Sequence, residues 1–179
     1  MSTNTNSNVR LTLLQQPEIA RSFGNGTSNF RSIDPPPILN LKIHQVEPTS
    51  ILNGHYIVTA TLWSVDERDE PVKELCTELA GNTIAESRVL ENLNGLMDII
   101  FIFPSLYVKN QGRYRICFRL ISVFTPTLDG LLPCTSVIDT LFSNVIQVFL
   151  RNRFPGKSKP SLLMQVLVKQ TDDLKARNL

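Results

Sequence analysis

The chain has 179 residues, of which 42% are hydrophobic and 19% charged, a composition typical of a folded protein and not of a disordered chain. Its length fits one domain, so we expect a disordered polar N-terminus at residues 1–8 and a single domain over residues 9–179. The longest aliphatic and aromatic run, Ile99 to Phe103, is far shorter than the roughly 20 residues of a membrane-spanning helix, and residues 1–8 lack the pattern of a secretory signal. We therefore expect an intracellular protein without a membrane partner.

The net charge of +2 hides a strong asymmetry along the chain. Residues 64–98 carry nine acidic and three basic residues, a net charge of −6, whereas the rest carries fifteen basic and seven acidic residues, a net charge of +8. The basic residues of that remainder gather at residues 109–119 and 151–159. Such a distribution can define an anion-binding face, and solvated strand edges and loops would give the same pattern.

Alternating apolar residues indicate strands in the first third of the chain. Residues 9–13 alternate with period two, and residues 39–43 do so again after three prolines. Between them, residues 15–34 are rich in glycine and asparagine, which predicts a long functional loop with one helical turn from Pro17 to Arg21. Residues 56–63 alternate after the turn signal Asn53-Gly54, so we expect them to pair with residues 39–43 as antiparallel neighbours.

The second half contains further strands. The acidic stretch 64–82 fits both a helix and a loop with short strands. Residues 96–103 form an apolar strand closed by Pro104, and residues 112–123 form another, with aromatic and aliphatic residues on one face and arginines on the other. We expect a long strand at residues 142–150, and a short helix or an edge strand at residues 161–170.

At least six strands without a repeated strand-helix-strand order predict a mainly β fold, an antiparallel β-sandwich with one or two short helices. The apolar residues of 136–150 fall on both faces of any strand, so one face needs a second cover. That cover is a helix or a second subunit, and we predict a dimer.

The residues that would carry enzymatic or metal chemistry are few. His44 and His55 stand outside any metal-binding motif, and no nucleophile, phosphate-loop or dinucleotide motif occurs. The three cysteines have no zinc-like spacing, so we expect them to be reduced and mostly buried. The acids of residues 66–70 fit a solvated hairpin tip better than a catalytic pair. We expect no enzyme, no cofactor, no metal and no small-molecule substrate.

Five motifs in a fixed order resemble the velvet domain of fungal regulatory proteins. They are Leu-Gln-Gln-Pro-x-x-Ala-Arg at 14–21, Arg-x-Ile-Asp-Pro-Pro-Pro at 31–37, Phe-Pro-x-Leu-x-Val at 103–108, Gly-x-Tyr-Arg-x-x-Phe-x-Leu at 112–120 and Arg-Phe-Pro-Gly at 153–156. The resemblance implies an immunoglobulin-like sandwich akin to the Rel/NF-κB DNA-binding domain. It also implies homo- or heterodimers of velvet proteins, nuclear action with cytoplasmic shuttling left open, and control of development, sporulation and secondary metabolism.

The resemblance also suggests which residues contact double-stranded DNA. Arg21 and Arg31 lie in the loop where a Rel-like sandwich presents its reading segment, and an arginine there could fork onto a guanine or bridge phosphates. Arg153, Lys157 and Lys159 belong to a basic loop at 151–159 that would contact phosphates.

One departure from the velvet pattern keeps an alternative open. Velvet domains that bind DNA look rich in Lys and Arg just before the Asp-Pro-Pro-Pro motif, whereas here residues 24–30 carry no base and only Arg31 remains. The alternative is a protein-only dimerisation module, in which a second velvet protein makes most DNA contacts. The sequence leaves open the DNA motif, the dimer partner, the import route and the role of the acidic segment 64–98.

Overall fold

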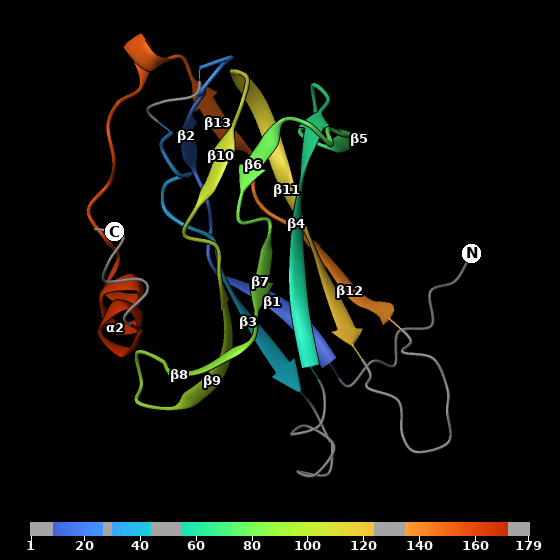
Figure 1. Ribbon diagram of the computed structural model, residues 1–179, viewed down its shortest axis with the longest axis vertical. Helices are drawn as coiled ribbons and strands as arrows, with labels where there is room; N and C mark the ends of the chain where they lie inside the picture. The colour runs from blue at the N-terminus through green and yellow to red at the C-terminus, as the bar shows by residue number, and fades with distance from the viewer. Residues whose placement is uncertain (1–8, 27–29, 44–54, 124–134, 172–179) are drawn as a thin grey trace.

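The computed structural model describes residues 9–26, 30–43, 55–123 and 135–171 (Figure 1). Two sheets carry most of the chain. The first has four strands, each antiparallel to its neighbours, in the order β1-β3-β9-β8. These are β1 (Val9–Gln15), β3 (Ile38–Ile43), β9 (Met97–Ile102) and β8 (Arg88–Glu91).

The second sheet follows the order β2-β13-β11-β4-β5, with β12 also paired to β11 and β7 to β4. Its strands are β2 (Ile19–Arg21), β13 (Ile146–Phe149), β11 (Gly112–Val123), β4 (His55–Val65), β5 (Pro71–Glu74), β12 (Thr135–Phe142) and β7 (Ile84–Glu86). Its pairs are antiparallel except for β2 and β13, which run parallel. The strands β6 (Leu79–Gly81) and β10 (Leu106–Val108) form a separate antiparallel pair.

The hydrophobic core lies between the two sheets. On β11 the side chains of Tyr114, Ile116, Phe118 and Leu120 are buried, as the alternation predicted, and the ring of Phe118 lies 5.3 Å from that of Phe103. Burial of such large side chains contributes about 1.5–3 kcal/mol each relative to exposure. The predicted mainly β sandwich is confirmed.

One helix covers the outer face of the first sheet. Helix α2 (Leu162–Gln170) begins after Ser161, whose Oγ accepts a hydrogen bond from the Met164 amide at 3.1 Å. A small second core forms where the helix packs on β3, β8 and β9; its members are Ile38, Leu90, Ile100, Ile102, Met164 and Leu167. Residues 161–170 are thus a helix, and Figure 1 shows it beside β8 and β9.

The last helical residue also holds the edge of the first sheet. The Gln170 side-chain amide accepts from the Glu91 amide (2.8 Å) and donates to the Glu91 carbonyl (2.9 Å). A side chain therefore occupies main-chain groups of β8 as a neighbouring strand would.

The predicted pairing of residues 39–43 with residues 56–63 is wrong. Strand β3 pairs with β1 and β9, whereas β4 pairs with β11, β5 and β7 in the other sheet. Alternation shows that a segment is a strand but does not identify its partner, and the twelve-residue β11 offers β4 a longer ladder. The turn signal Asn53-Gly54 lies outside the described residues.

Two further expectations are corrected. The helical turn from Pro17 to Arg21 is wrong: β2 occupies Ile19–Arg21, because Ile19 pairs with Asp34 and β2 pairs with β13. The strand expected at 142–150 is shorter than predicted: β12 ends at Phe142, and β13 occupies only Ile146–Phe149. Buried Ser143 separates them, and its Oγ accepts from the Ile116 amide at 2.9 Å and donates to the Asn144 carbonyl.

The acidic stretch 64–82 contains the short strands β5 and β6, which agrees with the loop interpretation. Of the cysteines, Cys117 is buried on β11, and burial, which is the largest effect, raises its pKa. Cys76 is exposed, contrary to expectation, and Cys134 lies outside the described residues.

Gly81 provides a test of the contact between β6 and β10. Its φ is +95°, and a Cβ atom there would lie 1.9 Å from the Ser105 carbonyl oxygen, so the two strands would have to separate. We expect Gly81→Ala to lower the free energy of unfolding by about 3 kcal/mol or more. Urea denaturation of the domain measures this change.

Gly24→Ala is the matched control. Gly24 also has a positive φ, +63°, but a Cβ atom added there would meet nothing within 4 Å. It should cost only about 1–2 kcal/mol, the cost of a left-handed conformation. Equal losses in both variants would contradict the close packing of β6 on β10.

Candidate nucleic-acid interface

The five basic residues predicted to contact DNA lie on three segments that are distant in sequence. Arg21 ends β2, and Arg31 lies on the segment that leads into β3. Arg153 belongs to the 3₁₀ helix η1 (Arg151–Arg153) after β13, and Lys157 and Lys159 lie between η1 and α2. All are exposed except Arg21, which is half-buried.

The parallel pairing of β2 with β13 brings the first and third segments together. Arg21 is the register partner of Phe149, and the Ser22 amide donates to the Phe149 carbonyl at 2.9 Å. Arg21 and Arg151 consequently line one hollow of about 320 Å³. Burial, followed by the positive charges of Arg31 and Arg151, lowers the pKa of Arg21 from its ordinary value.

A second hollow, of about 640 Å³, joins the middle and third segments. Arg31 and Lys157 both line it, with Phe30 and Tyr107 on its apolar side. The backbone behind Arg31 is fixed, because the Ile33 amide donates to the Leu106 carbonyl at 2.8 Å.

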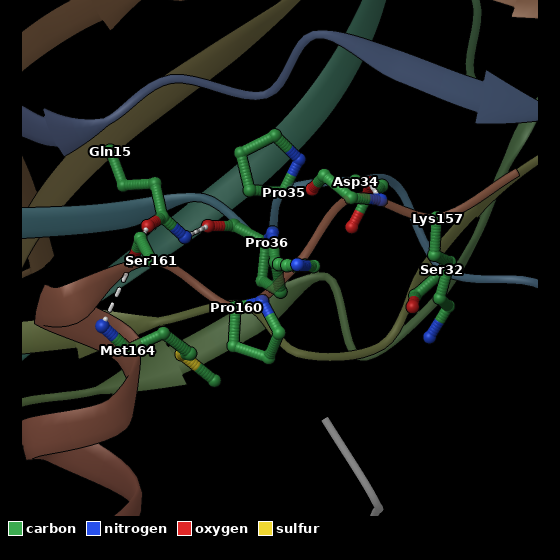
Figure 2. A pocket seen from close by; sticks show the side chains of 11 residues that line it. Gln15, Ser32, Asp34, Pro35, Pro36, Lys157, Pro160, Ser161 and Met164 are labelled. Atoms are coloured by element: carbon green, nitrogen blue, oxygen red, sulfur yellow. Dashed lines mark hydrogen bonds between the residues drawn. The ribbon is translucent and has the colours of Figure 1, made fainter.

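The third hollow, of about 280 Å³, is the pocket in Figure 2. Gln15, Ser161 and Met164 lie at one end, and Asp34, Ser32 and Lys157 lie at the other. Prolines form its wall, and Lys157 and Lys159 are both among its lining residues. Lys157 thus belongs to two adjacent hollows, which makes the basic surface continuous from Arg31 to Lys159.

Asp34 anchors the lysine segment to the proline motif. Asp34 is only 6% exposed, and its Oδ2 accepts a hydrogen bond from the Ser158 amide at 2.6 Å (Figure 2). Its own backbone is tied to β2, since its amide and carbonyl both bond to Ile19. The residue between the two lysines is thus held by a buried carboxylate.

Arg153 differs from the other four predicted residues. It is exposed in η1 and is not among the residues that line these three hollows. Its neighbour Arg151 does line one and acts on Arg21, a role that the sequence did not assign. The sequence shows that residues 151–153 are basic. It does not show that Arg151, rather than Arg153, lies beside Arg21, because this placement depends on the pairing of β2 with β13.

The arginines on β11 face a different environment. Arg119 forms an ion pair with Glu74 at 2.9 Å, and Arg113 forms one with Asp69. Bonding to Glu74 is the largest cause that raises the pKa of Arg119. The acidic segment therefore neutralises part of the β11 cluster, and the basic surface of the three hollows stays separate from it.

Within the described ranges, no three His, Cys, Asp or Glu side chains are grouped so as to hold a metal ion. In the same ranges, no helix has the length and apolar character needed to cross a membrane.

The anchoring role of Asp34 can be tested by proteolysis. We expect Asp34→Ala to speed trypsin cleavage after Lys157, because the unanchored Ser158 amide lets the segment leave the surface. The variant should also lose about 1.5–3 kcal/mol of unfolding free energy, the value of a hydrogen bond to a charged group. Mass spectrometry of the digest and urea denaturation measure these two effects.

Asp34→Asn retains a side-chain oxygen and should restore part of the protection. The control is Asp66→Asn, which alters a carboxylate that accepts from the amides of Arg68 and Glu70 in a distant exposed turn. Unchanged cleavage after Lys157 in Asp34→Ala would contradict the anchor.

Comparison with known proteins relates this chain to a family. The Velvet factor family model matches residues 9–75 and 67–178. The sexual development regulator umv3 of Mycosarcoma maydis is 24% identical over 97% of this chain and 46% of its own length. The spore development regulator RYP2 of Ajellomyces capsulatus is 26% identical over 96% of this chain and 43% of its own length.

The developmental and secondary metabolism regulator veA of Penicillium rubens is 30% identical over 84% of this chain and 30% of its own length. The chain thus spans less than half the length of these curated relatives, which are named as regulators and not as enzymes. Because the family model covers nearly every residue from β1 onward, including the segments that carry the three hollows, the chain belongs to the Velvet factor family.

Proposed function

We propose that this chain is a DNA-binding velvet domain of a transcriptional regulator that controls fungal development and secondary metabolism. In this proposal it acts in the nucleus as a homo- or heterodimer of velvet domains and exchanges with the cytoplasm. The names of the relatives support the regulatory role, since they describe regulators of sexual development, sporulation and secondary metabolism.

The observation that carries DNA binding is the convergence of basic side chains from three segments on adjacent hollows. Arg21 with Arg151, Arg31 with Lys157, and Lys157 with Lys159 each share a hollow. A surface of this kind fits a polyanion whose charges repeat along a line, because each phosphate can meet a different pair of bases.

Mutual repulsion of the arginines supports the same proposal. After burial, which is the largest cause, the charges of Arg31 and Arg151 also lower the pKa of Arg21, so the free domain holds like charges close together. A bound phosphate would relieve that repulsion, and an arginine with a fixed backbone can keep its planar guanidinium in one orientation. We therefore assign base reading to Arg21 and Arg31, and phosphate contact to Arg153, Lys157 and Lys159.

The first test separates reading from positioning. Arg21→Ala or Arg31→Ala should weaken binding to a selected site about 5- to 150-fold, equivalent to about 1–3 kcal/mol. The same variants should weaken binding to random DNA by a smaller factor. Lys157→Ala combined with Lys159→Ala should weaken both equally and reduce the slope of log affinity against log salt by about 1.8. Fluorescence anisotropy across a salt series measures these quantities.

Lys73→Ala on β5 is the matched control, because it removes a lysine from the acidic hairpin. It should leave binding unchanged. Arginine variants that keep site preference while the lysine variant abolishes it would invert the assigned roles. Binding that appears only in a mixture with a second velvet domain would instead support the protein-only dimerisation module.

The second test concerns the dimer. Helix α2 covers the first sheet and not β12, and Val137 on β12 remains 57% exposed. We expect a dimer at micromolar concentration in analytical ultracentrifugation, and Val137→Asp should shift it toward monomer because it places a charge in an apolar contact.

Val72→Asp provides the comparison for this variant, since Val72 is 61% exposed on β5. It should leave the association unchanged. A monomer at all concentrations, alone and with a velvet partner, would refute dimerisation.

A further inference from the structure

Phe23, Phe30 and Tyr107 form a cluster of three aromatic rings beside the basic surface. The rings of Phe23 and Phe30 lie 4.8 Å apart, and those of Phe30 and Tyr107 lie 5.4 Å apart, with tilts of 56° and 52°. This aromatic cluster joins the segment after β2 to strand β10. Aromatic pairs at such distances stabilise each other by about 0.5–1.5 kcal/mol beyond their area burial, so Phe30 is held firmly.

The aromatic cluster is not needed merely to fix the chain in place. The Phe23 amide already donates to the Val108 carbonyl at 3.1 Å, and the Gly24 amide donates to the Lys109 carbonyl at 2.9 Å. Backbone bonds therefore fix this segment to β10. Phe30 nevertheless remains 43% exposed, although phenylalanine is a residue that folding normally buries.

The surroundings of the exposed ring indicate what could cover it. Phe30 lines the same hollow as Arg31 and Lys157, so cations flank the apolar surface. An apolar protein partner would have to bury those cations or supply acids for them. Duplex DNA brings phosphates for the cations and, between them, apolar base and sugar surfaces for the ring.

We infer that Phe30 is an apolar wedge that enters a base step of duplex DNA from the minor groove, with Arg31 beside it. The inference rests on the proposed DNA binding and adds the residue that deforms the duplex. Side chains of this type unstack a step and bend DNA, and a narrow minor groove attracts an adjacent arginine. Phe23 and Tyr107 supply the rigid backing that a wedge needs.

The test uses the whole chain and a 20-base-pair duplex selected from a random pool by the wild-type protein. Copies of this duplex carry 2-aminopurine at successive positions, whose fluorescence rises when a base is unstacked. We expect wild-type protein to raise the fluorescence at one or two adjacent positions. Phe30→Ala should abolish that rise and weaken binding about 5- to 50-fold, with the salt slope unchanged because no charge is lost.

Phe30→Leu separates a wedge from a change in structure, because leucine also serves as a wedge and should keep most of the fluorescence rise. Val72→Ala, which truncates an exposed apolar side chain on β5, is the matched control and should behave as wild type. A lower salt slope in Phe30→Ala would mean that the ring only positions the cations of Arg31 and Lys157, and would overturn the inference.

Two other outcomes separate this inference from the proposed function. If wild-type protein binds the duplex with a steep salt dependence but Phe30→Ala binds and unstacks equally well, only the wedge is refuted. If wild-type protein binds no duplex, DNA binding by this chain fails and the wedge fails with it. If Phe30→Ala loses affinity only for single-stranded DNA, the wedge is also overturned, since the ring would then stack on unpaired bases.

Discussion

Strand β11 sets the geometry on which the rest of the domain depends. It pairs with β4 over ten register positions, and with β12 and β13 along its other edge, so three strands take their positions from it. One of its faces fills the space between the sheets with Phe118 and its neighbours. Its other face carries Arg113 and Arg119, whose ion pairs join β11 to Asp69 and Glu74 of the acidic segment. A single alternating pattern thus supplies both the core and the attachment of the charged hairpin.

The basic surface depends on a chain of contacts that begins at β11. Because β13 pairs with β11, and β2 with β13, Arg21 comes to lie near Arg151. The segment before β3 is then fixed by the bonds between Ile19 and Asp34, and the Asp34 carboxylate holds Ser158. An acidic residue thus helps to organise a basic surface, since a cation in its place would leave the Ser158 amide unbonded and add repulsion. The positions of the segments that carry these cations therefore depend on strand pairing and on the Asp34 hydrogen bonds.

The sequence predicted the parts of this molecule that follow from local pattern. The bounds of β11 agree with the residues 112–123 that alternate, and the covered face of that strand was identified correctly. Strand pairing was less accessible: β3 and β4 were placed together, although they lie in different sheets, because period-two alternation carries no information about the partner. The strand β2 was missed for a related reason. The three residues of β2 are too few to show an alternating pattern, and the strand forms because β13 lies alongside it.

The same distinction applies to the candidate site. Arg21 and Arg31 were named from the motifs and Lys157 from the basic loop that follows them. The structure places Arg31 and Lys157 on one hollow and Arg21 close enough to Arg31 for its charge to act on the Arg21 pKa. Arg151 and Phe30 could not be selected, because their importance depends on neighbours far away in sequence: Arg21 for the first, and Tyr107 for the second.

The two hydrogen bonds between the Gln170 side chain and the Glu91 backbone have a consequence for the behaviour of the domain in a crowded cell. An edge strand with unpaired amides and carbonyls is a template on which other chains can add, and Val89 makes this edge apolar as well. By occupying both main-chain groups of Glu91, the end of α2 interrupts that template with a side chain that cannot itself be extended. While the helix is docked, it therefore opposes aggregation, because another chain cannot pair with β8 at Glu91 and extend the first sheet there.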